Sequence, residues 1–582
     1  MSLRRRAFAA LLAVLAAPAG AWTPELDTTT LTPRERLAAQ ALIERVNQRL
    51  PAAMAARLPA LRLAFDALPP AVHGRIRGQR IVLARRLLDG DGADAALLHE
   101  LAHAFDRRAR LARDPRLLDL AGWQLRPRRF GLRGRNRLVD RSPDAYELTS
   151  PREFVAVNLE HFLLDPEYAC RRPALFDYFT AHLGAPRHAP ARCEAALPLV
   201  LPGDQTPLQA LDPARVYRID YLLAEPTGAL ASRWGHAMLR LVICAPERTP
   251  GPDCRLDLAH HRVLSFRAFV DDVQISGWRG LTGRYPSRLF VLPLDQVIEE
   301  YTATELRGLR AVPLRLSAKE RAGLLRRAAQ LHWSYDGRYA FLGNNCASEI
   351  FKLLHDGVPR LAQAPIAAIT PTALLRRLER AGIADSAPLR REDAVRLGYL
   401  FPPADRHYAE LFELARAALA LPARDAPTWL DLPASRRAPW MARGDLRASA
   451  ALLVLEEAAL RRAELRARDA IKRQLLRHRG DALRTLFDQA LTLEGTLLRP
   501  AALLDGVPGY GLPQAAELQW LGQRADAAQR RLEEHRQRLH ALAREALPPD
   551  RREALDGARR NLQRLSAHLR QLAAKDAATP AP

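Results

Sequence analysis

The sequence predicts a multidomain α+β protein whose last third is helical. The chain has 582 residues, which exceeds one ordinary domain and suggests three. Short alternating apolar runs typical of strands occur within 61–83 and 216–269, among segments with the helical period. The helical period dominates after residue 385. We therefore expect a leader at 1–21 and domains at 22–200, 205–385 and 386–582.

The first 21 residues have the features of a signal peptide. Arg4 to Arg6 precede a short apolar run from Ala7 to Pro18, and Ala19-Gly20-Ala21 is typical of a cleavage site. This run is short for a membrane span, and no later stretch offers 18 uninterrupted apolar residues. We expect a periplasmic or secreted protein that is soluble or peripheral at a membrane.

The five cysteines fit an oxidising compartment. Cys170 and Cys193 flank one Pro-rich stretch, Cys244 and Cys254 flank one short loop, and Cys346 is left over. The number and spacing of the cysteines predict two local disulfides and one free thiol. An unpaired thiol in such a compartment suggests a functional role.

The formal net charge is +23, and its excess is uneven. From Arg107 to Arg141 there are twelve arginines against three aspartates. A local cationic field favours an anionic envelope partner, such as a lipid head group, a lipoprotein or the cell wall. A solvated Arg-rich loop is the alternative. Export argues against nucleic acid, and the oligomeric state stays open.

The most specific pattern is LLHELAHAFDRR at residues 97–108. On a helix, the four-residue spacing puts His99 and His103 on one face, where both imidazoles can bind one metal ion. Glu100 then lies beside the metal and can take a proton from water. The pattern predicts a hydrolytic Zn²⁺ site. The alternative is a surface helix with two unrelated histidines.

The third ligand is expected from the segment 149–168. Ser150 is a helix N-cap, Pro151 takes the first helical position, and Glu153 and Glu160 share a face. A helix reading E-F-x-A after H-E-x-x-H resembles the gluzincin-type metallopeptidases. The resemblance implies a zincin-like domain in which Glu153 completes the site, with Glu160 as the second choice. Alternatively, Glu153 merely completes a capping box with Ser150.

The middle region carries a candidate cysteine nucleophile. Strands are expected at 216–223, 236–243 and 262–269, with His236 at the entrance of the second. Asn344 or Asn345 caps a helix from Cys346 to Gly357, whose dipole would stabilise the thiolate. His236 is the preferred base, with His332 and His261 as lesser candidates. Alternatively, Cys346 is a small buried residue and His236 a polar residue at a strand edge.

Three segments of this region carry a second resemblance. GHAMLRL, YTATELRGLRAVPLRLSAKE and NNCASEI resemble the domain that includes bacterial lipoprotein intramolecular transacylases, which are similar to a circularly permuted papain or NlpC-type fold. The resemblance implies Cys346 as nucleophile, His236 as base, and Tyr301, Glu305 and Arg307 as supporting residues. An acyl-enzyme would then pass its acyl group to water or to an amine. Two departures concern the substrate: membrane-embedded segments are lacking, and Ala347-Ser348 replaces expected threonines.

The C-terminal region predicts long helices at 518–546 and 555–572, separated by Pro548-Pro549. The apolar seams of the two helices predict an antiparallel hairpin resembling a coiled coil, with His535 as a tolerated polar residue at the seam.

As a whole, the sequence predicts an exported envelope enzyme, a hydrolase or acyltransferase with a zinc-hydrolase domain. The alternative is an envelope scaffold, binding lipid or a partner, in which one or both sites have decayed.

Overall fold

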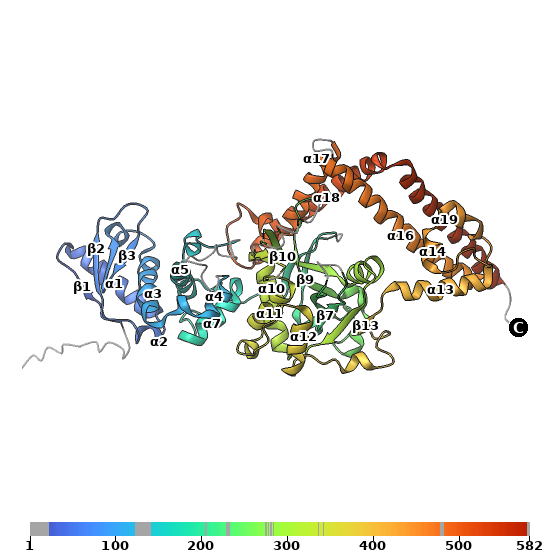
Figure 1. The fold of residues 1–582 in the computed structure, drawn as a ribbon. Helices are drawn as coiled ribbons and strands as arrows, with labels where there is room; N and C mark the ends of the chain where they lie inside the picture. Colours follow the sequence, from blue (N-terminus) through green and yellow to red (C-terminus); the bar gives the residue numbers. More distant parts are fainter. Residues whose placement is uncertain are drawn as a thin grey trace, which may run out of the picture. The chain divides into compact units, whose positions relative to one another are not determined.

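The computed structural model describes residues 22–122, 141–203, 206–228, 233–273, 276, 279, 282, 284–335, 337–341, 343–477 and 482–578 (Figure 1). The chain forms two compact units, Met1–Asn136 with Ser142–Cys193, and Arg137–Arg141 with Glu194–Pro582. The expected signal peptide and most of the Arg-rich segment lie outside the described residues.

The first unit contains a four-stranded sheet in the order β1-β2-β4-β3. Strands β1 (Glu25–Leu26), β2 (Arg62–Asp66) and β4 (Arg80–Ala84) are parallel, and β3 (Gly74–Arg77) pairs antiparallel with β4 at the edge. The apolar runs predicted β2 and β4. The sequence Gly-Arg-Ile-Arg of β3 is too short and too polar to have been recognised.

Two helices of this unit bring the candidate ligands together. Helix α3 (Ala93–Ala109) packs against β3, β4 and α5 (Pro151–Leu164). Helix α1 (Pro33–Arg49) begins with a Thr32–Glu35 capping box. The remaining helices are α2 (Ala52–Ala55), α4 (Pro115–Leu120), α6 (Tyr168–Arg171) and α7 (Pro173–Leu183).

The second unit is built on a seven-stranded sheet in the order β12-β10-β9-β8-β7-β11-β13, in which neighbouring strands are antiparallel. The three predicted strands are β7 (Val216–Ala224), β8 (His236–Ile243) and β9 (Arg262–Ala268). Four others were not predicted, namely β10 (Tyr285–Pro293), β11 (Leu309–Pro313), β12 (Gly337–Tyr339) and β13 (Leu400–Phe401). Strands β5 (Leu197–Val200) and β6 (Leu208–Leu211) form a separate hairpin.

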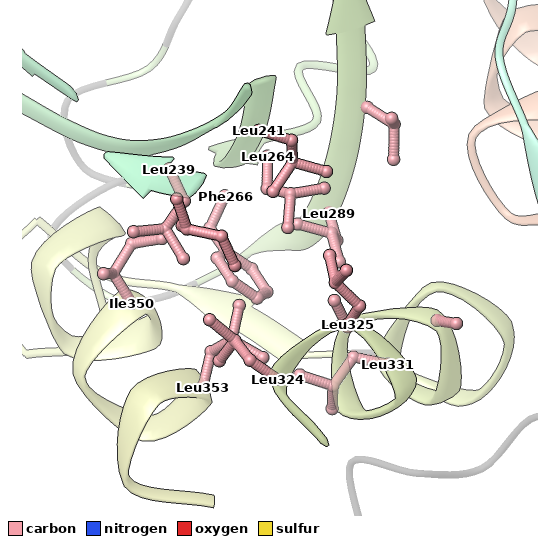
Figure 2. Close-up of a cluster of buried hydrophobic side chains, with 14 of the residues drawn as sticks. Leu239, Leu241, Leu264, Phe266, Leu289, Leu324, Leu325, Leu331, Ile350 and Leu353 are labelled. Atoms are coloured by element: carbon pink, nitrogen blue, oxygen red, sulfur yellow. The ribbon is translucent and has the colours of Figure 1, made fainter. Parts of the chain in front are cut away.

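Different helices cover the two faces of this sheet. On one face, α10 (Ala318–Ser334) and α11 (Cys346–Gly357) pack leucines against Leu239, Leu264 and Phe266 (Figure 2). On the other, α9 (Leu294–Ile298) packs against Met238 and Val263. Alternation along β8 therefore sends neighbouring side chains into two different cores.

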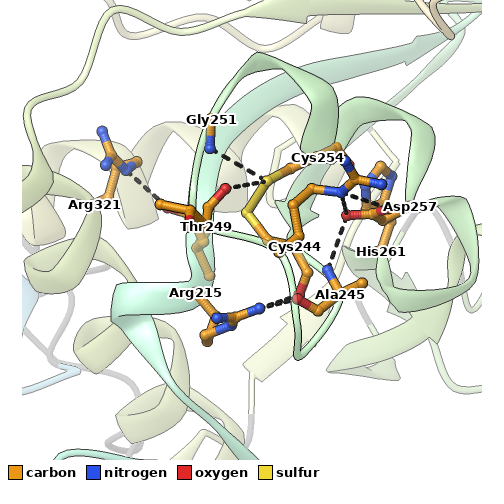
Figure 3. Close-up of a disulfide and its surroundings, with 11 residues drawn as sticks. Arg215, Cys244, Ala245, Thr249, Gly251, Cys254, Asp257, His261 and Arg321 are labelled. Carbon is orange, nitrogen blue, oxygen red and sulfur yellow. Dashed lines mark hydrogen bonds and ion pairs between the residues drawn. A yellow bond between two sulfur atoms is a disulfide. The ribbon is translucent and has the colours of Figure 1, made fainter.

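Both predicted disulfides are confirmed. Cys170 bonds Cys193 in the first unit, and Cys244 bonds Cys254 across the loop after β8 (Figure 3). In that loop the Ala245 amide donates to Asp257 at 2.9 Å. Cys346 is the free cysteine, and it is buried.

The predicted helical hairpin is wrong in its pairing, although both helices exist. Helix α18 (Ala515–Ala546) packs on α17 (Ala482–Leu497), and α19 (Pro549–Ala578) packs on α16 (Leu446–Arg477). The apolar residues of each helix, such as Leu532 and Leu565, belong to different cores, so they do not form a shared seam. His535 is half-buried, and its ring contacts the Arg531 carbonyl.

Shorter helices complete the second unit: α12 (Pro371–Arg380), α13 (Ala404–Leu419), α14 (Ala426–Asp431) and α15 (Ala434–Arg437). None of the helices in the described part of the chain combines the length and apolar content that a membrane crossing requires.

Candidate functional site

The two histidines of the H-E-x-x-H motif lie one turn apart on α3. The ring centroids of His99 and His103 are 4.9 Å apart, and both side chains are largely buried. The two rings share one face of the helix, as the four-residue spacing predicted, and their Nε2 atoms face Glu153 of α5.

Glu153 joins them from the first turn of α5. Its Oε2 lies 3.1 Å from Nε2 of His103 and 3.4 Å from Nε2 of His99. One ligand atom from each of the three residues falls within 4.8 Å of the others. Ser150 caps α5 by accepting the Glu153 amide hydrogen bond, but the Glu153 side chain faces the histidines and does not return to Ser150. Ser150 therefore starts the helix without holding the Glu153 carboxylate.

The donor set fits a divalent cation. Two imidazoles and one carboxylate are typical of an open zinc site, in which three protein ligands leave a position for water. Oε2 of Glu153 is buried and, apart from the two imidazole Nε2 atoms that face it, has no donor among the described residues. A buried carboxylate oxygen without a donor is costly unless it meets a positive charge, so a cation at this point would satisfy it.

Glu160 lies behind His99, on the side away from this cluster. Its Oε2 is 3.4 Å from His99 Nδ1. Burial alone would lower the pKa of His99, but contacts with Glu153 and Glu160 outweigh it and raise the pKa to about 9. Burial alone would raise the pKa of Glu153, but His103 and His99 lower it to about 2. Glu160 thus has the position of a residue that orients a ligand.

The side chain of Glu100, a residue of α3, is buried against the edge strand β3. A methyl group at Gly74 would come within 3.0 Å of the Glu100 side chain, so the missing side chain at Gly74 provides the space for it. Burial raises the pKa of Glu100, and His103 and His99 partly oppose this. A raised pKa suits a carboxylate that accepts and returns a proton near neutral pH.

Tyr146 is a neighbour that the sequence did not reveal. Its ring centroid is 6.4 Å from that of His99, and 53% of the residue is exposed. Burial, with the charges of Glu153 and Glu100, raises its pKa. It lies in a single 3₁₀ turn at 145–148, a segment without any recognisable motif.

Cys346 begins α11 as predicted, with Asn345 as the N-cap. The Asn345 side chain accepts from the Ala347 and Ser348 amides at 3.1 and 3.2 Å. The expected low pKa of the thiol is wrong. Burial raises it, although the Ala237 amide and the Tyr339 hydroxyl act in the opposite direction. The thiol is therefore kept neutral by the apolar core around it.

Among the described residues no hydrogen bond joins His236 to the Cys346 sulfur, so the two side chains do not form the expected hydrogen-bonded pair. Its Nε2 lies 3.0 Å from Ser265 Oγ, and its ring stacks on Tyr301 with centroids 6.2 Å apart. Strand alternation explains this, because Ala237 belongs to the core of Cys346 and Met238 to that of Tyr301. Burial, Arg267 and Arg307 lower the pKa of His236 to about 3.

The two lesser candidates for the base, His261 and His332, contact other groups. His261 contacts Arg240 and the Cys254 carbonyl, and His332 accepts from the Val200 amide at 3.0 Å.

The residues implied as supporting lie near His236. Arg307 stands over the Tyr301 ring at 5.2 Å and pairs with Glu305 at 2.5 Å. Tyr301 and Arg307 therefore both lie near the His236 ring.

Two families match parts of the chain. Residues 204–381 match the Lnb N-terminal periplasmic domain, and residues 94–193 match a domain of unknown function, DUF7844. No curated protein and no solved structure matches the chain. The first match, together with the two disulfides, indicates a protein of the bacterial envelope with a periplasmic domain.

Proposed function

We propose that this envelope protein is an enzyme whose first unit is a zinc-dependent hydrolase of the metallopeptidase type, with a zincin-like fold. The observation that carries the proposal is the convergence of His99, His103 and Glu153 around one point. The buried Glu153 oxygen, which only the two imidazoles face among the described residues, supports a cation there.

The residues divide the chemistry among them. His99, His103 and Glu153 would hold the zinc ion, which when bound polarises a carbonyl group and acidifies water. Glu100 accepts the proton from the attacking water and returns it to the leaving amine. Glu160 holds the His99 ring in the orientation that presents Nε2 to the ion.

The edge strand supports a peptide as substrate. Within the described part of the chain β3 ends the sheet beside Glu100, so an extended chain can pair with its edge at Gly74, while the carbonyls of Ile76 and Gly78 accept from Arg107. Such a chain would pass its backbone carbonyls in front of Glu100. The substrate is then a peptide or a peptide-bearing component of the envelope.

Cleavage of a peptide library tests the proposal. Full-length protein loaded with zinc is incubated with a mixture of peptides of random sequence, and the products are identified by mass spectrometry. We expect cleavage that Glu100→Gln reduces by at least about a hundredfold without loss of zinc. Bound zinc with no cleavage under any condition would favour the alternative, a scaffold whose site has decayed.

A second activity is proposed for the second unit, in which residues 204–381 would form a permuted papain-like domain. Cys346 lies at the start of α11, and the Ala237 amide faces its sulfur. An amide at that point can bind the oxyanion of an acyl intermediate. The thiolate would attack an ester or amide carbonyl, and water or an amine would then take the acyl group.

His236 would serve this reaction as the base only after a change of side-chain rotamer, because its ring faces Tyr301.

Incubation with p-nitrophenyl butyrate tests the proposed thiol activity. We expect one butyryl group on Cys346, none in Cys346→Ala, and much slower acylation in His236→Ala. A Cys346 that stays unacylated would restrict the activity of the protein to the zinc site.

A further inference from the structure

A pocket rich in arginine lies one helical turn from the candidate zinc site. Its volume is about 400 Å³, and its lining includes Arg107 and Arg110 at the end of α3, Arg113 after it, and Arg152 on α5. One acidic side chain, that of Asp106, also lines it. These residues belong to the first unit.

The positive charge of this pocket is not neutralised within the part of the chain that the structure describes. The side chains of Arg110, Arg113 and Arg152 form no ion pair with a described residue. Arg107 donates to the carbonyls of Gly78 and Ile76 and likewise forms no ion pair with a described residue. Asp106 is turned inward, where it accepts from the Ala112 amide at 2.8 Å. Guanidinium groups gathered in this way suit a carboxylate or phosphate.

The pocket and the zinc ligands are carried by the same two helices. His103 precedes Arg107 by one turn of α3, which advances about 6 Å along the axis. On α5, Arg152 is the residue before Glu153. An anion in the pocket would therefore lie within reach of a molecule bound at the zinc site.

Strand β3 connects the two places. Gly74, its first residue, adjoins Glu100, and the carbonyls of Ile76 and Gly78 at its other end bind Arg107. An extended peptide advances about 3.3 Å per residue. These carbonyls lie two and four residues beyond Gly74, so a chain that follows β3 passes from Glu100 to the pocket within two to four residues.

From this arrangement we infer that the pocket recognises an anionic group of the substrate, a carboxylate or phosphate, two to four residues from the bond that is cleaved. The inference rests on the proposed zinc hydrolase and names its substrate class. It assigns Arg107, Arg110, Arg113 and Arg152 to specificity, while the chemistry stays with Glu100 and the ligands.

Calorimetric titration of the full-length protein tests the inference. The carboxylate probe is acetyl-Asp-Ala-Ala-amide, with acetyl-Asn-Ala-Ala-amide as its neutral counterpart, and the phosphate probe is inorganic phosphate. Each is titrated into wild type, Arg113→Gln, Arg152→Gln and the control Arg34→Gln, an exposed arginine on α1. All titrations are made with zinc-loaded and with EDTA-treated protein, because zinc itself binds anions.

We expect at least one of the two anions to bind about tenfold more weakly to Arg113→Gln and Arg152→Gln, with and without zinc, and less than twofold more weakly to Arg34→Gln. Which anion responds identifies the group as carboxylate or phosphate. Affinities that change less than twofold in both variants for both probes overturn the inference. Circular dichroism verifies that the variants are folded, and zinc analysis of the same samples reports separately on the proposed function.

Discussion

Glu153 Oε2 lies 3.1 Å from His103 Nε2, although fifty residues separate them in the chain. The contact exists because α5 packs along α3 with its first turn beside the two histidines. A carboxylate and two imidazoles are thereby brought to one point in a largely buried setting. The proposed zinc chemistry depends on this relationship.

Glu160 should tune zinc affinity without being a ligand. In Glu160→Gln, His99 loses the carboxylate that faces its Nδ1 at 3.4 Å. We expect zinc affinity to fall about 10–100-fold, as for other partners of ligating histidines. Competition with a chromogenic chelator measures this. The control is Glu167→Gln, an exposed carboxylate on the same unit; equal affinities in the two variants would contradict the orienting role.

Zinc binding should depend on pH up to the alkaline range. The pKa of His99 in the metal-free protein is about 9, and zinc needs the neutral ring. We expect the apparent affinity to rise about tenfold per pH unit from pH 6.5 to 9 and then to level off. In Glu160→Gln the plateau should begin at lower pH. An affinity that is constant between pH 7 and 9 would show that His99 binds no proton there.

The raised pKa of His99 also affects the stability of the metal-free protein. A raised histidine pKa stabilises the fold below the unfolded value of 6.5, and this contribution is lost as pH rises through about 9. Denaturant unfolding of EDTA-treated protein should therefore show decreasing stability over this range, and His99→Gln should remove most of that decrease.

Gly74→Ala should disturb Glu100 while leaving the zinc ligands in place. The added methyl group would meet Leu83 at 2.9 Å and Glu100 at 3.0 Å. Crowding of this kind costs about 1–3 kcal/mol, so urea unfolding should begin earlier, with zinc content unchanged. Gly90→Ala is the matched control, since its methyl group has only an ordinary contact at 3.6 Å. Equal stability of the two variants would refute the close approach of β3 to Glu100.

Cys346 should react slowly with alkylating agents at neutral pH. Burial raises its thiol pKa, and the Tyr339 hydroxyl is one of the groups that oppose the rise. We expect iodoacetamide to label Cys346 more slowly than free cysteine, and still more slowly in Tyr339→Phe. Tyr217→Phe, which alters a tyrosine packed near the Cys244–Cys254 disulfide, is the control. Labelling as fast as that of free cysteine would mean that the thiol is exposed and ionised.

Local patterns in the sequence predicted the parts of the site that depend on one helix. The spacing of His99 and His103 places both rings on one face of α3, and Ser150 marks the start of α5. Each of these features depends on one helix, so the sequence pattern was sufficient to predict it. The choice between Glu153 and Glu160 required the packing of α5 on α3, which determines which carboxylate faces Nε2 and which faces Nδ1.

The errors concern relationships between elements. Cys346 and His236 were expected to form a pair, but strand alternation directs the His236 ring into the core of Tyr301. The thiol pKa was inferred from the helix terminus, and burial outweighs that effect. The α18–α19 hairpin was inferred from two apolar seams, which pack on α17 and α16 instead. A pattern within one segment does not specify the segment that it packs against.

Zinc analysis by plasma mass spectrometry tests the central claim most directly. Purified protein is loaded with zinc, dialysed, and compared with Glu153→Ala and with the control Glu167→Gln. We expect one zinc ion per chain in the wild type and in Glu167→Gln, and a loss of most of the zinc in Glu153→Ala. Wild-type protein that holds no zinc, or Glu153→Ala that retains a full equivalent, would contradict it.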